Sequence, residues 1–571
     1  MKERKWWQSA IGYEIYPRTF FDSNGDGVGD LPGIISKLDY LEKLGVTILW
    51  ICPFFKSPMD DNGYDVSDYY QVDPVFGKNA DFLNLISMAH QKGIRVIIDF
   101  VLNHTSDEHP WFLEARTNRK SPKRDYYIWR DGKVNAEGKR VPPNNWQGFF
   151  DDSAWNYDEV AGQYYLKIFS KKMPDLNWES PALRQNIYQI ARYWLDQGVD
   201  GFRLDAIAHL AKDLTWSDSP YDVGPDGTTL DSRKFSSIPR LFDYLREFKT
   251  EVLSRYPNAM AVGEVGGCAT TEEALKYSGT DKGSIDMVFN FDSCWENGAY
   301  GSEHKSDEEI VANVVNLKHI FLRWYTDCRA KAWLPIYWNN HDHPRVLSQY
   351  GDIHFRKESG KMLATTLLFM YGTPFLYNGE EIGMSNVDYQ EIRDFKDVSA
   401  MNYYKNAQRH MTEAEILRFL RRTSRVNART PFQWTSGPHA GFSTHEPDTK
   451  VVGNYMDVNV ESEEKDPDSI LNFYRKAIAL RKTPKILEAV IGGEFVLVDS
   501  EHPDVFAYAH KGATPLMVIS NFRKFSATFK IPFAIKQILL HNYPTTEMKD
   551  GILTLRPFES YLLELSPEAK L

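Results

Sequence analysis

Short runs of apolar, often β-branched residues recur along the first two thirds of the chain and alternate with segments of helical periodicity. Ile34, Leu38 and Leu41, for example, follow helical spacing and stop at Gly45. Continuous apolar runs of this length are typical of parallel strands buried on both faces. We therefore predict an α/β fold of the closed (β/α)8 type, a TIM barrel, with strands at 12–17, 46–51, 95–101, 199–204, 259–264, 286–291, 334–338 and 373–378.

Two intervals between these elements are longer than a single helix requires. Residues 104–175, after the third strand, are rich in aromatic residues and Asn, which predicts an inserted subdomain. A second long interval, at about 379–465, follows the eighth strand and precedes a helical pattern at 469–482. Regularly spaced short strands from 493 onward predict a C-terminal antiparallel β-sandwich. The predicted domains are the barrel at 1–103 and 176–484, the inserted subdomain at 104–175 and the β domain at 485–571.

Composition narrows the class of protein. The 571 residues carry 67 Lys and Arg against 78 Asp and Glu, a net charge of −11, which argues against nucleic acid or an anionic membrane as partner. No apolar signal segment or membrane-length stretch is evident, so we expect a cytoplasmic protein. Aromatic residues make up 14% of the chain, a proportion that suits a sugar-stacking site. The cysteines form no close pair and are expected to be buried free thiols, Cys52, Cys268, Cys294 and Cys328.

Candidate chemistry lies at the predicted strand ends, because functional groups of such barrels gather at the carboxyl ends of the strands. Three carboxylates from different strands converge there, Asp205, Glu264 and Asp342. Polar neighbours at the same ends are Asp99, Asn103, His104, Arg203 and His341. A strand-end Asp can cap the next helix, but several together indicate a site. Three clustered carboxylates could hold magnesium or form a glycosidase pair with a helper.

Several motifs occur in order at these ends. They are DFVLNH (99–104), GFRLDAIAH (201–209), GEVGG (263–267) and YWNNHD (337–342), with PDLNW (174–178), GTPFLYNGEEIG (372–383) and RVNARTPFQW (425–434) as further segments. The set resembles the α-amylase family, glycoside hydrolase family 13. The branch it resembles contains α-glucosidases, oligo-1,6-glucosidases, trehalose-6-phosphate hydrolases, sucrose isomerases and trehalose synthases. The resemblance extends from about Trp6 to the β domain.

The resemblance implies a role for each strand-end carboxylate. Asp205 would be the nucleophile, Glu264 the general acid/base, and Asp342 the residue that binds the sugar-ring hydroxyls. His104 and His341 would donate hydrogen bonds in the transition state. Arg203, two residues before Asp205 on the same strand face, is expected to hold that nucleophile as the anion. Glu264 is expected in a less compensated, more apolar setting, where it keeps its proton.

The segment GYD (63–65) resembles the part of the family that closes the first sugar subsite. Tyr64 would stack on the glucose ring, and Asp65 would accept its hydroxyl protons. Arg425 would pair with Asp65 and close the far end of the pocket. The family usually has Asp where this chain has Val426, so the neighbouring support of Arg425 differs here.

DSNGDGVGD (22–30) places oxygen donors at alternate positions, an arrangement suited to Ca²⁺. The predicted ligands are Asp22, Asn24, Asp26, the Val28 carbonyl and Asp30. Position twelve is Gly33 rather than Glu and no helix precedes the loop, so an EF-hand is not expected. The resemblance also implies a structural calcium ion in the loop after the first strand. No organic cofactor is expected.

The leading hypothesis is a retaining, exo-acting α-glucosidase that acts on short oligosaccharides and also transfers glucose. In the branch that the chain resembles, Val after the nucleophile accompanies α-1,6 activity, whereas Ala206 here indicates α-1,4 preference. The alternatives are an oligo-1,6-glucosidase, a sucrose or trehalose isomerase, and a trehalose-6-phosphate hydrolase. The RLDRD segment of sucrose isomerases has no counterpart in 295–309. A non-catalytic barrel ranks last, and the expected state is a monomer or weak homo-oligomer.

Overall fold

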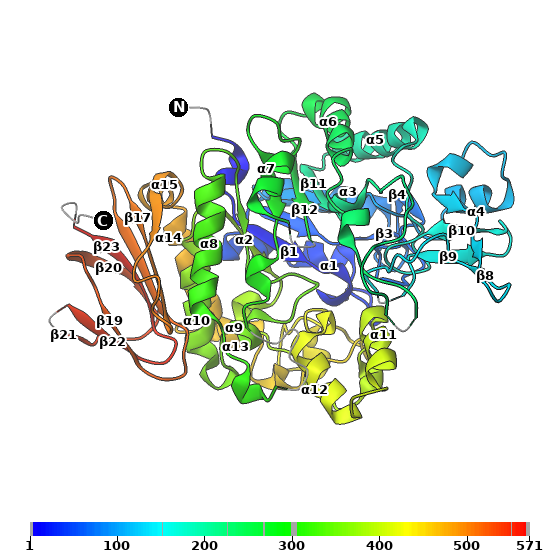
Figure 1. Ribbon diagram of the computed structural model, residues 1–571. Helices are drawn as coiled ribbons and strands as arrows, with labels where there is room; N and C mark the ends of the chain where they lie inside the picture. Colours follow the sequence, from blue (N-terminus) through cyan, green and yellow to red (C-terminus); the bar gives the residue numbers. More distant parts are fainter. Residues whose placement is uncertain are drawn as a thin grey trace.

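The computed structural model describes residues 4–150, 152–224, 226–266, 269–297, 305–549 and 551–566 (Figure 1). Its centre is an eight-stranded sheet in which every ladder is parallel, in the order β13-β12-β11-β5-β2-β1-β15-β14. β13 and β14 contact each other across the remaining seam, so the sheet curves into a nearly closed barrel. The (β/α)8 prediction is confirmed, and each of the eight expected runs contains a strand. The strands are β1 (Gly12–Ile15), β2 (Ile48–Ile51), β5 (Arg95–Val101), β11 (Gly201–Asp205), β12 (Met260–Glu264), β13 (Met287–Phe289), β14 (Pro335–Ile336) and β15 (Thr373–Tyr377).

The register of neighbouring strands aligns the polar residues of the site. Arg203 on β11 lies opposite Asp99 on β5, and Glu264 on β12 lies opposite Phe289 on β13. The barrel interior below them is filled by apolar side chains, including Trp50 and Ile97. Charged groups therefore collect at one end of a dry core, where they are held by the strands rather than by loops.

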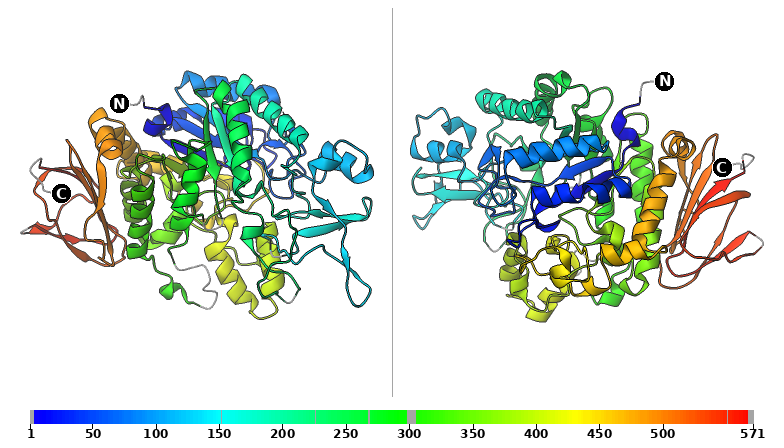
Figure 2. Two further views of the ribbon diagram at one scale, coloured as in Figure 1. Left: turned by 45° about the horizontal axis from the view of Figure 1, so that its top comes forward. Right: turned by 180° about the vertical axis from the view of Figure 1, so that it is seen from behind.

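Helices cover the outside of the barrel (Figure 2). The predicted helix before Gly45 is two helices that break at Lys37, and Gly45 ends the second with a φ of 96°, a conformation that suits glycine. The barrel helices are α1 (Leu31–Ser36), α2 (Leu38–Leu44), α3 (Asn79–Gln91), α5 (Pro181–Asp196), α6 (Leu241–Glu251), α7 (Thr271–Ser278), α8 (Val314–Cys328), α9 (Val346–Tyr350), α10 (Arg356–Leu368) and α14 (Ile470–Arg481).

Two excursions of the chain lie beside the carboxyl ends of the strands. The first is the inserted subdomain, at the opposite end of the molecule from the C-terminus (Figure 1). It contains the antiparallel sheet β6 (Trp129–Arg130), β10 (Gln163–Leu166) and β9 (Trp155–Asp158), the hairpin β7 (Lys133–Val134) and β8 (Arg140–Val141), and α4 (Pro110–Thr117), a helix that the pattern did not predict. The hairpin β3 (Phe55–Lys56) and β4 (Asp68–Val72) precedes it. The second excursion, after β15, has its own apolar core and contains α11 (Val398–Ala407), α12 (Glu413–Thr423) and α13 (Val460–Lys465).

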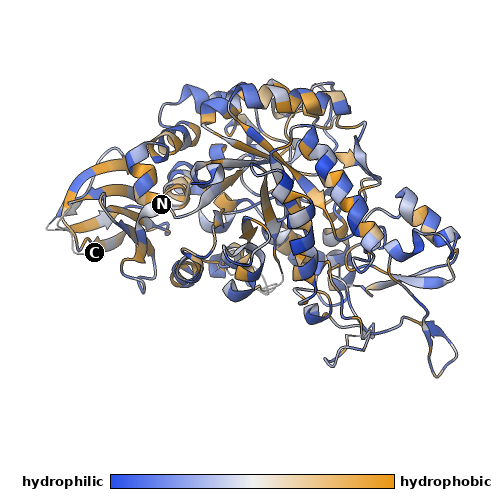
Figure 3. Ribbon diagram, turned by 90° about the horizontal axis from the view of Figure 1, so that it is seen from above, coloured by the Kyte–Doolittle hydropathy of each residue, from blue (hydrophilic) through white to orange (hydrophobic). Residues whose placement is uncertain are grey.

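The C-terminal domain is antiparallel, as predicted, with sheets of five and three strands. Its elements are α15 (Pro484–Gly492), β16 (Glu494–Leu497), β17 (Val505–Lys511), β18 (Leu516–Asn521), β19 (Ala527–Lys530), β20 (Ile535–His541), β21 (Met548–Lys549), β22 (Ile552–Leu555) and β23 (Ser560–Leu565). The sequence did not predict β20, because only one of its seven side chains is buried and two register irregularities break its alternation. Figure 3 shows apolar residues concentrated in the barrel strands and in this domain's sheet.

The C-terminal domain is fixed to the barrel through α10. The Tyr508 hydroxyl donates to the carbonyl of Thr366 at 2.7 Å, and His510 Nε2 bonds that of Phe369 at 2.7 Å. In the described part of the chain, no helix has both the length and the apolar character needed to cross a bilayer. Cys52, Cys294 and Cys328 are buried free thiols, and Cys268 lies outside the described residues.

Candidate active site

A cavity of about 380 Å³ opens at the carboxyl ends of the barrel strands. Barrel residues form its floor, the inserted subdomain contributes an aromatic wall, and the segment after β15 contributes one end. The residues that line it include Asp61, Tyr64, His104, Phe149, Phe150, Phe169, Asp205, Ala206, His209, Glu264, Phe291, Trp295, Asp342, Ser399 and Arg425. The three strand-end carboxylates named from the sequence thus share one cavity.

Arg203 organises the floor of the cavity. Its Nη1 donates to Asp205 Oδ1 at 2.6 Å and to Asp99 Oδ1 at 2.8 Å, and its Nη2 contacts Glu264 Oε2. Asp99 also accepts from the Trp50 indole at 3.2 Å. One guanidinium, 1% exposed, therefore serves three carboxylates. This geometry corrects the expectation that Glu264 would lack such compensation, because Arg203 pairs with it as well as with Asp205.

The electrostatics of this floor favour retention of a proton. Burial raises the pKa of Asp205 well above its usual range, and the charges of Glu264 and Asp99 raise it further against the opposing effect of Arg203. Contrary to the prediction, Arg203 alone therefore does not hold Asp205 as the anion, because it is shared among three carboxylates. Both carboxylates contact the same guanidinium, Asp205 through Nη1 and Glu264 through Nη2. Two carboxyl groups held on one guanidinium are consistent with the retaining arrangement, whereas an inverting pair leaves room for a water at about 6.5–9.5 Å.

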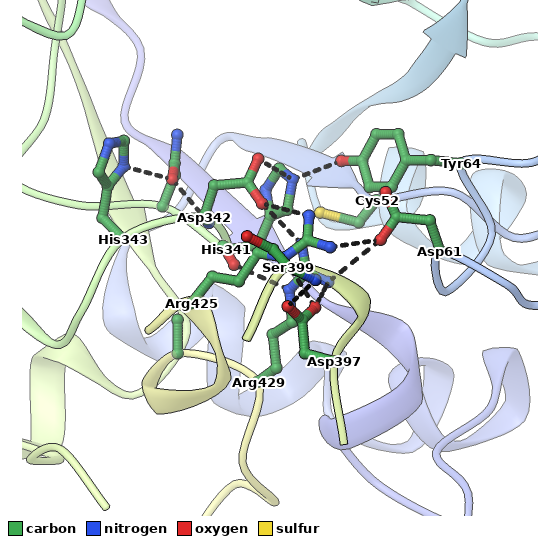
Figure 4. Close-up of polar contacts among 12 residues, drawn as sticks. Cys52, Asp61, Tyr64, His341, Asp342, His343, Asp397, Ser399, Arg425 and Arg429 are labelled. Carbon is green, nitrogen blue, oxygen red and sulfur yellow. Dashed lines mark hydrogen bonds and ion pairs between the residues drawn. The ribbon is translucent and has the colours of Figure 1, made fainter. Parts of the chain in front are cut away.

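Asp342 lies on another side of the cavity, beside His341 (Figure 4). His341 Nε2 is 3.1 Å from Asp342 Oδ2 and 2.6 Å from the hydroxyl of Tyr64, whose ring stacks on the imidazole at 5.3 Å. Burial acts to raise the pKa of Asp342, but His341 and Arg429 hold it well below its usual range. Asp342 is therefore an anion, suited to accept hydrogen bonds from sugar hydroxyls.

Arg425 closes one end of the cavity, but with partners that differ from the prediction (Figure 4). Its Nη2 donates to Asp61 at 2.6 Å, its Nε to Asp397 at 2.7 Å, and its Nη1 lies 3.5 Å from Asp342. Arg429 adds a bond of 2.6 Å to Asp342. The predicted pairing of Arg425 with Asp65 is wrong, and the missing support at Val426 is supplied by Asp397.

Asp65 serves the loop instead of the cavity. Its carboxylate accepts from the backbone amides of Asp60 and Asp61, at 2.9 and 3.1 Å, and from the Ser57 hydroxyl at 2.9 Å. The side chain is fully buried, and burial raises its pKa to about 6. It thereby orients Asp61, which lines the cavity in its place. The only sequence signal for Asp61 was a second Asp three residues before Tyr64, and Asp397 had none.

His104 and Ala206 lie where the sequence placed them, on the cavity surface. His104 is buried, its Nε2 has no protein partner, and burial lowers its pKa to about 3, so a neutral ring faces the cavity. Ala206 has a φ of 48°, a left-handed conformation that is costly for a residue with a side chain and typical of functional positions. Sequence reasoning missed His209, which lines the cavity beside Ala206.

The predicted calcium loop lies away from the carboxylates, against residue 443. Asp22 accepts from the amides of Asn24, Gly25 and Gly27 at 3.0, 2.7 and 2.8 Å, and from the Ser443 hydroxyl at 2.6 Å. Asp30 caps α1 through the amide of Gly33 at 2.6 Å. The loop is thus ordered by its own carboxylates.

Comparisons with known proteins agree with this architecture. The family model for the catalytic domain of α-amylase matches residues 14–489. An oligo-1,6-glucosidase of Parageobacillus thermoglucosidasius is 41% identical, with 99% of each chain covered, and an α-glucosidase of Pediococcus pentosaceus is 39% identical, with 98% of this chain and 99% of that one covered. The crystal structure of a trehalose-6-phosphate hydrolase of Bacillus licheniformis matches at a TM-score of 0.90 and 37% identity, covering 99% of this chain and 100% of that one.

The chain therefore belongs to the α-amylase family, glycoside hydrolase family 13, and to its α-glucosidase branch. It is a glycoside hydrolase, and the retaining mechanism is general for the family.

Proposed function

We propose that the protein is an exo-acting α-glucosidase that releases the terminal non-reducing glucose of short α-linked oligosaccharides with retention, and that it prefers α-1,4 linkages. The observation that carries the proposal is a cavity with Asp205 and Glu264 on one guanidinium and with its end closed by Asp61 and Arg425. A closed end beside the reacting carboxylates admits one sugar beyond the scissile bond, which favours exo action.

The proposed reaction has two steps. In the reactive form the proton is on Glu264. The Asp205 carboxylate attacks the anomeric carbon while Glu264 protonates the departing glycosidic oxygen, so a glucosyl ester forms and the C–O bond to the leaving sugar breaks. A water then gives its proton to Glu264 and attacks the same carbon, releasing glucose and Asp205. A sugar hydroxyl that replaces the water would give transglucosylation. Asp342, Tyr64, His104 and His341 would hold the glucose ring in the first subsite.

Ala206 supports the α-1,4 preference. It follows Asp205 and lines the cavity beside His209, where a larger β-branched side chain would narrow the acceptor side. The alternative is an oligo-1,6-glucosidase, which the name of the Parageobacillus relative favours. A phosphorylated acceptor is less well supported, because Arg425 is the only Lys or Arg among the described lining residues and is already paired with three carboxylates.

The direct test is product analysis with maltose, isomaltose, sucrose, trehalose and trehalose-6-phosphate. We expect glucose from maltose at the highest kcat/KM, with the α-anomer formed first. Faster turnover of isomaltose would replace the linkage assignment with α-1,6, and conversion of sucrose to an isomer would replace hydrolysis with transfer.

Ala206→Val sharpens the linkage test. We expect the ratio of kcat/KM for maltose to that for isomaltose to fall by about 10–200-fold, the range for one or two methyl groups in a pocket. A β-branched residue is also strained at this left-handed backbone, so both substrates can slow. Because the strain slows both substrates, its effect cancels in the ratio of the two kcat/KM values. An unchanged ratio would mean that Ala206 supports Asp205 without selecting the acceptor.

We also propose that the 22–30 loop binds a structural Ca²⁺. Its donor set is all oxygen, with Asp22, Asn24 and Asp26 in successive turns in which each side chain accepts from the amide two residues on. Bound calcium would stabilise only the folded chain, by about 2.7 kcal/mol at 100 times its Kd. We expect calcium to raise Tm in the wild type but not in Asp22→Ala/Asp26→Ala, with turnover retained. A calcium-independent Tm in the wild type would refute the site.

Cytoplasmic location and the monomeric or weakly oligomeric state stay predictions from sequence.

A further inference from the structure

Beneath the cavity, Glu14 forms a buried contact that the mechanism above leaves unused. Glu14 is on β1, between Trp50 of β2 and Tyr377 of β15, and is 2% exposed. Its Oε1 is 2.6 Å from His341 Nδ1 and also accepts from the His341 amide at 3.3 Å. Glu14 does not line the cavity, so it acts on the sugar only through His341.

We propose that Glu14 is a positioning residue that keeps the His341 imidazole doubly protonated, so that its Nε2–H is presented to Asp342 and Tyr64. This inference rests on the glucosidase function proposed above. With protons on both ring nitrogens, His341 donates to Glu14 below and toward Asp342 and Tyr64 above. The imidazolium then lies between two carboxylates, Glu14 and Asp342, and its side chain is fully buried.

The direction of one hydrogen bond depends on this charge. The Tyr64 hydroxyl is 2.6 Å from His341 Nε2 and donates to Asp99 at 3.1 Å. The hydroxyl has one proton, so it can give that proton to Asp99 only if it does not donate it to His341. A neutral His341 with its proton on Nδ1 would instead present a lone pair to Asp342, 3.1 Å away, and compete for the Tyr64 proton. Loss of the charge would therefore disturb both Asp342 and the Asp99–Arg203 floor.

Every group that faces the His341 ring is consistent with a cation. Glu14 approaches from β1, Asp342 from the next residue and Tyr64 from the loop after β2, with Tyr16 stacked at 6.1 Å and Trp50 edge-on at 6.0 Å. Arg429 bonds the His341 carbonyl, not the ring, and Asp99 is reached through Tyr64. Burial lowers the pKa of His341, but the charges of Asp342 and Glu14 hold it well above its usual range.

Glu14, Cys52 and His341 have the residue types of a metal site and approach one another within 4.8 Å. Their hydrogen bonds indicate otherwise. Burial raises the pKa of the Cys52 thiol, so it keeps its proton and donates to Glu14 Oε1 at 3.3 Å. A metal needs the thiolate and a free nitrogen, whereas here the carboxylate oxygen is the shared acceptor of the Cys52 thiol, the His341 ring and the His341 amide.

Glu14→Gln tests the charge without changing the shape of the side chain. An opposite charge at this distance shifts a pKa by about one to three units, so its loss lowers the pKa of His341. Since the protonated ring is the active form, activity should be lost on the basic side. We expect kcat/KM to fall by about 10–100-fold near pH 8, less than the roughly 10²–10³-fold loss of a direct transition-state donor. Near pH 5.5 the loss should be within a few-fold, and Tm should change little.

Glu381→Gln is the matched control. Glu381 is also a buried barrel glutamate and accepts from the hydroxyls of Tyr13 and Tyr40 at 2.7 and 2.6 Å, without contact to His341. We expect its substitution to lower Tm but to leave the basic limb of the kcat/KM profile in place. A Glu14→Gln variant that behaves in the same way, with an unshifted limb, would reduce Glu14 to a structural role and overturn the proposal.

A double-mutant cycle with His341→Gln isolates the route of the effect. If Glu14 acts through His341, Glu14→Gln should change kcat/KM by less than about 3-fold in the His341→Gln background. Additive losses would overturn the proposal. Independently of turnover, ¹⁵N NMR of histidine-labelled protein should show His341 as an imidazolium to above pH 8 in the wild type and titrating in Glu14→Gln. A wild-type enzyme inactive on every α-glucoside would refute the proposed function, whereas the NMR result alone decides the charge of His341.

Discussion

Two buried clusters of carboxylates and arginines lie in the same cavity and behave differently. The Arg203 cluster joins Asp99, Asp205 and Glu264 to one guanidinium. The closing cluster joins Asp61, Asp342 and Asp397 to two, Arg425 and Arg429. In the first, burial raises the pKa of Asp205, and in the second, the arginines and His341 hold the pKa values of Asp342 and Asp397 low despite burial.

The difference shows that the ratio of arginines to carboxylates decides whether the carboxylates of a cluster are all charged or retain a proton. Three carboxylates on one arginine cannot all be charged at low cost, so the Arg203 cluster keeps a proton available for transfer. In the closing cluster, two arginines and an imidazolium keep Asp342 and Asp397 as anions, and Asp342 suits permanent acceptance of sugar hydroxyls. Chemistry and recognition are thus separated by charge balance within one cavity.

The largest expected effect is in the Arg203 cluster. Asp205→Asn removes the nucleophile and one negative charge, so the glucosyl ester cannot form. We expect kcat to fall by at least about 10³-fold while Tm stays equal or rises, because a buried carboxylate is relieved. Turnover and thermal unfolding of the same preparation provide the check. A variant with a tenth of wild-type activity would remove Asp205 from the role.

A smaller effect is expected in the closing cluster, where two neighbouring aspartates give a matched pair. Asp61→Asn weakens the bond to Arg425 in the cavity, and we expect kcat/KM to fall by about 10–100-fold, mainly through KM, as for loss of a charged hydrogen bond. Asp65→Asn disturbs the loop behind it, so Tm should fall with a smaller change in KM. Steady-state kinetics and thermal unfolding compare them. The reverse ranking would restore Asp65 as the sugar ligand.

The last effect is on stability and leaves turnover unchanged, and it concerns a buried carboxylate that contacts no arginine of the described residues. Glu380 accepts from the Tyr474 hydroxyl at 2.9 Å, and burial raises its pKa to about 8. Between about pH 5 and 8 the folded chain holds a proton that the unfolded chain has lost, so stability falls as pH rises through this window. The Glu380→Gln side chain does not titrate, so this fall in folding stability with rising pH is absent from the variant. We expect its Tm, relative to wild type, to increase from pH 5 to 8 by an amount equivalent to a few kcal/mol. A constant difference would contradict the comparison.

Much of the fold was predictable because buried strands and their ends leave local patterns. The eight apolar runs contained the eight barrel strands, and Asp205, Glu264 and Asp342 share the predicted edge. The partners of Arg425 were not predictable from local pattern. Asp61 and Asp65 differ only in which one the loop turns inward, and Asp397 reaches Arg425 from the start of α11. Likewise, the contact of Arg203 with Glu264 depends on the placement of β11 beside β12.

The closed end of the cavity also bears on how the chain becomes active during synthesis. Asp61 and Arg425 are 364 residues apart, and β1 pairs with β15 through Gly12 and Phe375. Contacts this distant in sequence close large loops and form late in folding. At about 5–20 residues per second, a ribosome needs about 20–90 s to pass Arg429. Until then a nascent chain has catalytic carboxylates but no complete sugar pocket, so substrate can stabilise only the nearly finished protein.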